Sequence, residues 1–117
     1  MRAYAPVSAE EISSLLSQGS ITPHSVFYLT PEYLDENPEL DEEECEYELS
    51  LQAARSAIGD GDFGLVLAAE VDGVGPITKA QLECVFECLP SDDAPEIELV
   101  WYGPSEVELH LPAWSAR

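Results

Sequence analysis

The densest group of ionisable side chains in this sequence lies between Glu32 and Glu48. Ten carboxylates fall in this segment, with no Lys, Arg or His among them. If the segment were one helix, rising about 1.5 Å per residue, the charges would spread over roughly 25 Å, a line density comparable with one phosphate per ~3.4 Å of a DNA strand. Such an array predicts electrostatic binding rather than a reaction. The ten are Glu32, Asp35, Glu36, Glu39, Asp41, Glu42, Glu43, Glu44, Glu46 and Glu48.

Two closer pairs of carboxylates have a spacing that acid–base or metal-assisted chemistry can use. Glu70 and Asp72 follow an apolar run, and Asp60 and Asp62 lie in a glycine-rich turn. A strand end followed by an Asp-Gly turn explains the first pair equally well, and turn preference explains the second, which also lacks the other ligands of a calcium loop. A small enzyme using Glu70 and Asp72 is therefore the alternative function.

Thiols and imidazoles are too sparse to predict a metal site or a nucleophile. Cys84 and Cys88 are four residues apart rather than three, and only Cys45 and His110 could complete a set of ligands from elsewhere in the chain. Free cysteines are usually buried, so core packing is expected for all three. Neither His24 nor His110 belongs to a catalytic motif, and no glycine-rich phosphate-binding motif occurs. We expect no cofactor, no metal and no catalytic residue.

Net charge limits the classes of partner. The chain has 117 residues, of which 24 are acidic and four basic, and its formal charge is −20. This field repels nucleic acid and anionic membranes, whereas it attracts a basic protein surface. The same charge could also serve solubility alone, with no charge-dependent partner.

Composition also predicts the compartment. Three cysteines are an odd number, which favours reduced thiols. The first residues lack the basic start and apolar core of a secretory signal, and no apolar run approaches the roughly 18 residues of a membrane span. We expect a soluble protein in the cytoplasm.

The N-terminal part of the chain predicts a strand, a helix and a second strand. Arg2–Val7 alternates as a short strand. Ser8 and Glu11 form a capping box at the start of a helix that Gly19 ends. Ser25–Leu29 is rich in strand-forming residues and is expected to lie at the centre of a sheet.

The acidic segment itself predicts two helices. Thr30, followed by Pro31, begins a short helical turn that the Asn37–Pro38 pair interrupts. Asp41 caps a longer helix that ends at Gly59. Spacing predicts that this helix turns Tyr47, Leu51, Ala54 and Ile58 toward the sheet, and leaves Glu42, Glu46 and Glu48 on its wet flank.

The C-terminal half predicts more strands. Leu65–Val71 is an apolar run typical of an interior strand. Lys79–Leu89 fits a strand or a helix, and we favour the strand. After a loop at Pro90–Pro95, the alternating runs Glu96–Tyr102 and Glu106–Leu111 predict a β-hairpin, or a strand and a loose tail. The whole chain is expected to be one α+β domain, a mixed or antiparallel sheet of about five strands with two helices on one face.

Six segments spread along the chain carry a resemblance. They are MRAYAPVS, TPEYLDE, DEEECEYELSLQAARSAI, LVLAAEV, GPITKAQLECVF and ELVWYGPSE. In these segments the chain resembles an uncharacterised family of small domains of unknown function that is common in actinobacteria. The resemblance implies a cytoplasmic α/β domain and a strand at Lys79–Leu89, and it transfers no catalytic residue.

The function predicted from the sequence is that of a non-enzymatic binding protein. Its acidic helix face would engage a basic protein surface, as a nucleic-acid mimic or inhibitor of a DNA- or RNA-handling protein. The alternatives are the enzyme using Glu70 and Asp72, and a housekeeping domain whose charge has no partner. The predicted partner-binding residues are Glu32, Asp35, Glu36, Glu39, Glu42, Glu43, Glu46 and Glu48.

Overall fold

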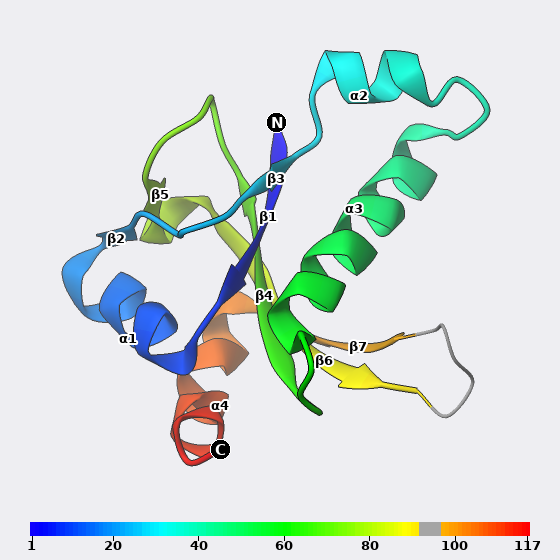
Figure 1. Cartoon of the computed structure of the whole chain (residues 1–117). Helices are drawn as coiled ribbons and strands as arrows, with labels where there is room; N and C mark the ends of the chain where they lie inside the picture. The colour runs from blue at the N-terminus through cyan, green and yellow to red at the C-terminus, as the bar shows by residue number, and fades with distance from the viewer. Residues whose placement is uncertain (92–96) are drawn as a thin grey trace.

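Five antiparallel strands form one sheet, with the strand β4 (Gly64–Glu70) at its centre (Figure 1). The structure is a computed structural model that describes residues 1–91 and 97–117. The strand order is β3-β1-β4-β6-β7, and all neighbours are antiparallel. The other four strands are β1 (Arg2–Val7), β3 (Phe27–Tyr28), β6 (Leu82–Pro90) and β7 (Ile97–Tyr102).

Helices cover both faces of this sheet. On one face, α1 (Ala9–Gln18) and α4 (Pro104–Ser115) pack against each other and share a core with Ala5 of β1, Leu67 of β4 and Val85 in the next strand, β6. On the other, α3 (Glu42–Ile58) packs against Val66 and Ala68. The expectation of two helices on one face is therefore wrong. β1 and β4 are apolar on both sides, so each side must be covered by a helix.

The remaining elements are short. α2 (Pro31–Glu36) precedes α3. β2 (Ser20–Ile21) and β5 (Ile77–Thr78) form a separate two-stranded sheet, and the 3₁₀ turn η1 (Lys79–Gln81) leads into β6. No helix in the described part of the chain is long and apolar enough to cross a membrane.

Local signals in the sequence were confirmed at several points. Both capping boxes form, with Glu11 N donating to Ser8 Oγ at 3.1 Å and Glu44 N donating to Asp41 Oδ1 at 2.8 Å. Gly19 adopts the left-handed conformation, with φ of 90°. The strand preferred for Lys79–Leu89 is present from Leu82 onward as β6, whereas Lys79–Gln81 form η1. The predicted strand Glu96–Tyr102 is present from Ile97 onward, and Glu96 and most of the predicted loop Pro90–Pro95 lie outside the described residues.

The predicted central strand at Ser25–Leu29 is wrong. Only Phe27 and Tyr28 pair, and they form the edge strand β3 beside β1. The pairing stops there because Thr30 and Pro31 turn the chain into α2.

The predicted strand Glu106–Leu111 is also wrong, since this segment lies within α4. Pro104 occupies the first helical turn, where its missing N–H costs nothing, and Glu106 Oε1 accepts a hydrogen bond from Gly103 N at 3.2 Å. Val107 and Trp114 are buried, while Leu109 is 77% exposed. The apolar residues therefore follow the helical spacing i, i+7 across the segment, and their alternation is incidental.

The face that α3 turns to the sheet differs from the predicted one. Its buried residues are Cys45, Leu49, Ser50, Ala53 and Ala54, so only Ala54 of the predicted stripe is fully buried, and Tyr47 is 56% exposed. Small side chains at Cys45, Ser50 and Ala53 let the helix backbone approach the sheet closely, which the larger Tyr47 would prevent.

Candidate functional site

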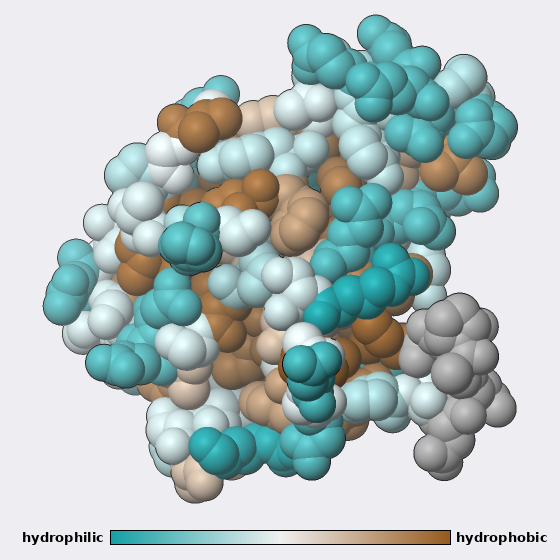
Figure 2. Space-filling model, in the orientation of Figure 1, coloured by the Kyte–Doolittle hydropathy of each residue, from teal (hydrophilic) through white to brown (hydrophobic). Residues whose placement is uncertain are grey.

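The eight predicted partner-binding residues lie together at one end of the molecule, and we call this set the acidic ridge. It extends over α2, the α2–α3 connection and the first two turns of α3. Figure 2 shows this end as a largely hydrophilic surface. Six of its carboxylates belong to exposed residues, whereas Glu46 and Glu48 are half-buried. The exposed six are Glu32, Asp35, Glu36, Glu39, Glu42 and Glu43.

Local sequence explains why the ridge is made of two helices. Thr30 Oγ1 accepts a hydrogen bond from Tyr33 N at 3.0 Å and begins α2, and Asn37 ends it. Tyr33, Leu34 and Leu40 then pack onto the core on the α3 side of the sheet. The charged residues between these apolar anchors are consequently left in water.

The ridge is bent rather than straight. α2 has six residues and α3 begins at Glu42, with the non-helical connection between them, and Figure 1 shows α2 running across the end of α3. The single straight helix of roughly 25 Å that would match a nucleic-acid strand is therefore not formed. The charges instead cover a corner of the molecule.

No cation neutralises the ridge within the described residues. Within residues 1–91 and 97–117, the only carboxylates in ion pairs are those of Glu70 and Glu83. Their partners are the Met1 ammonium and Arg2. Burial raises the pKa of Tyr4, and the charge of Glu46 raises it further. Burial likewise raises the pKa of Tyr33, with contributions from Cys45 and then Glu48. Glu46 therefore lies near Tyr4 of β1, and Glu48 lies near Tyr33 of α2.

A shallow depression lies within the ridge. It has a volume of about 310 Å³ and is lined by Leu40, Asp41, Glu43, Glu44, Tyr47 and Glu48. The sequence stripe assigned Tyr47 to the core, so this aromatic wall was missed. The signal that could have indicated an exposed Tyr47 was its position between Glu46 and Glu48 in an acidic turn of the helix. An aromatic face beside carboxylates can hold an alkyl stem that ends in a cation.

Of the two residues of the alternative enzyme site, Glu70 is engaged in ion pairs. Glu70 Oε1 accepts a hydrogen bond from the Met1 ammonium at 2.7 Å, and Glu70 Oε2 lies 3.9 Å from Arg2 Nε. Asp72 lies in the exposed turn after β4. Glu70 therefore ties the start of β1 to the end of β4.

All three cysteines are buried and free. Burial raises the pKa of Cys84 to about 11 and that of Cys88 to about 12. The described residues contain no group of three or more His, Cys, Asp or Glu that could hold a metal ion. The His110 ring packs at a tilt against Tyr102, with ring centroids 4.3 Å apart, so both cysteines and this histidine contribute to packing.

The raised pKa values of Cys84 and Cys88 predict that the folded protein loses stability in alkaline solution. An unfolded cysteine ionises near pH 9.0, but folded Cys84 and Cys88 keep their protons, so the unfolded chain binds fewer protons above that pH. We expect the free energy of unfolding to fall by about 1 kcal/mol per thiol between pH 9 and pH 10. Urea titrations at both values measure it. Cys88→Ala should reduce the pH dependence, and an unchanged slope would contradict the prediction.

Comparison with known proteins yielded one match. The model of a family described as a family of unknown function, DUF6912, matches residues 1–85. These residues include the whole ridge and end within β6, before β7 and α4. No curated protein and no solved structure matches the chain.

Proposed function

The chain belongs to the DUF6912 family of unknown function, and we propose that it is a small acidic binding protein whose ridge engages a basic protein surface. The observation that carries this proposal is the set of ridge carboxylates on α2 and the start of α3, which form no ion pair with any residue that the structure describes. A basic surface would be steered to it over long range. The groove of a nucleic-acid-binding protein offers the required Lys and Arg side chains, so the ridge would inhibit that protein by competing with its substrate. A cytoplasmic location and an actinobacterial source belong to the same proposal.

The bend of the ridge and its depression indicate how such contact would be made. Carboxylates alone give attraction and orientation, but a tight interface also needs buried aromatic anchors. Tyr47 is 56% exposed beside Leu40 and Glu48. A partner Lys or Arg would place its alkyl stem on Tyr47 and its charge among the carboxylates of the depression.

Reversal of four ridge charges tests the proposal. The test variant combines Asp35→Lys, Glu36→Lys, Glu39→Lys and Glu43→Lys, all at exposed residues that form no helix cap. It reduces the magnitude of the net charge from −20 to −12. We expect at least an about tenfold loss of partner in pull-downs from the source organism, because charge-steered interfaces depend on local complementarity. Wild-type binding should also weaken steeply between roughly 50 and 200 mM salt.

A matched control separates the ridge from total charge. Asp60→Lys, Asp72→Lys, Glu98→Lys and Glu108→Lys give the same net charge from exposed positions elsewhere. The control variant should bind the partner as wild type does. Tyr47→Ala should weaken binding of the partner, and added duplex DNA should displace the protein from it. If both quadruple variants behave alike, or if salt has no effect, the proposal is wrong.

A further inference from the structure

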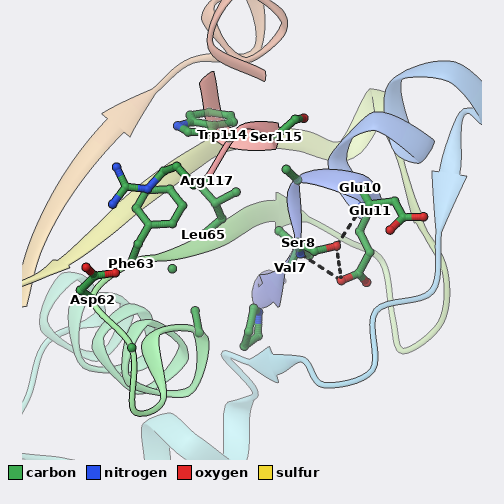
Figure 3. Close-up of a pocket in the computed structure, with 15 residues that line it drawn as sticks. Val7, Ser8, Glu10, Glu11, Asp62, Phe63, Leu65, Trp114, Ser115 and Arg117 are labelled. Atoms are coloured by element: carbon green, nitrogen blue, oxygen red, sulfur yellow. Dashed lines mark hydrogen bonds between the residues drawn. The ribbon is translucent and has the colours of Figure 1, made fainter. Parts of the chain in front are cut away.

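A second candidate site lies at the opposite end of α3 from the ridge. It is an open groove of about 730 Å³ between the start of α1, the turn after α3 and the end of α4 (Figure 3). Val7, Leu65 and Trp114 are buried in its floor. The groove contains none of the ridge residues.

The charges that line the groove favour a cation. Three acidic residues, Glu10, Glu11 and Asp62, and one basic residue, Arg117, line it. Glu11 Oε1 accepts hydrogen bonds from Ser8 N at 3.0 Å and from Ser8 Oγ at 3.3 Å, so a carboxylate already occupies the α1 N-terminus. The negative charge of that carboxylate would repel an anionic ligand at the helix N-terminus. Glu10 and Asp62 are exposed and form no ion pair with any described residue.

One wall of the groove already holds a guanidinium group. Arg117 Cζ lies 3.9 Å from the centroid of the Phe63 ring, and Figure 3 shows the two side chains stacked beside Asp62. We propose that the groove binds an extended peptide segment carrying an arginine, and that Arg117 occupies the place of that arginine in the free protein. The rest of the peptide would lie along the groove, and its guanidinium would take the Phe63 face with Asp62 next to it.

Exchange of one guanidinium for another is feasible because Arg117 is weakly held. Its side chain is exposed, and it makes no ion pair within the part of the chain that the structure describes. An exposed cation–π contact is readily broken. The incoming arginine would meet the same Phe63 ring and the same Asp62 as Arg117 does. The contacts that the rest of the segment makes along the groove therefore supply the additional binding.

Two synthetic peptides test this site. Acetyl-Gly-Leu-Arg-Leu-Gly-amide is titrated into the full chain by calorimetry and by ¹⁵N NMR, beside the same peptide with citrulline, which keeps the shape of arginine without its charge. We expect the arginine peptide to bind about tenfold more tightly and to shift the amides of Ser8, Asp62 and Phe63. Equal binding of the two peptides, or tighter binding of a glutamate version, would overturn the proposal.

Variants assign the contacts. Phe63→Leu and the pair Glu10→Gln, Asp62→Asn should each weaken the arginine peptide, whereas Arg117→Ala should bind it about two- to fivefold more tightly because the competing contact is gone. The four-lysine ridge variant should bind it as wild type does. Weaker binding by Arg117→Ala would mean that Arg117 contacts the ligand, and loss in the ridge variant would mean that the general field binds it. Either result overturns the proposal, and neither bears on the ridge's own partner.

Discussion

Replacing Trp114 by alanine is expected to destabilise the protein by about 3–5 kcal/mol, because it empties a large site in the core. Trp114 is 3% exposed, and its Nε1 donates a hydrogen bond to Glu87 Oε2 at 2.7 Å. Its ring also meets Tyr102 edge-on, with centroids 5.3 Å apart. The residue therefore fastens α4 to β6 and β7, and its loss removes both the packing and the partner of a half-buried carboxylate.

Urea denaturation measures this effect, with Trp101→Ala as the matched control. Trp101 is 57% exposed, so its truncation should cost far less. Trp114→Phe should be intermediate, since it keeps most of the ring and loses only the donor to Glu87. Equal losses for Trp114→Ala and Trp101→Ala would show that α4 contributes little to the folded state.

Gly64→Ala is the second change with a large expected effect, about 3 kcal/mol, the upper end for overpacking a core. A Cβ at Gly64 would lie 2.7 Å from the carbonyl carbon of Ala57 and 2.8 Å from Ile58 N. These are backbone atoms of the last turn of α3, which cannot rotate away. The start of β4 and the end of α3 are thus in contact only because residue 64 has no side chain.

Gly73→Ala is the control for this substitution. A Cβ there meets nothing within 4 Å, so reduced entropy of the unfolded chain should leave stability unchanged or slightly raised. Thermal unfolding of both variants measures the difference. Gly64→Ala with the stability of wild type would mean that α3 shifts freely on the sheet.

Signals that act over three or four residues could be predicted from the sequence. The capping boxes of Ser8 and Asp41 depend only on residues within three positions. The strand β4 could be predicted because its residues form a continuous apolar run. The rotation of α3 and the helix at Pro104–Ser115 could not be predicted in the same way. Both depend on which side chains fit against the sheet, and that surface is assembled from distant segments.

The two candidate sites also differ in whether their residues are neighbours in the sequence. The acidic ridge could be predicted because its carboxylates are neighbours in the chain, although its bend and the exposure of Tyr47 could not. The groove could not be predicted at all. Its walls come from three separate segments, represented by Glu10, Asp62 and Arg117, and no local pattern relates them.

The pairing of β1 with β4 also sets when the protein can fold during its synthesis. Arg2 lies opposite Glu70, and Val7 opposite Leu65, so the first strand has no long partner until β4 has left the ribosome. At about 5–20 residues per second, β1 waits roughly 3–14 s with its apolar residues uncovered. Contacts so distant in sequence also form slowly in refolding. In that interval, repulsion between the charges of the segment between Glu32 and Glu48, which emerges before β4, would oppose association of nascent chains.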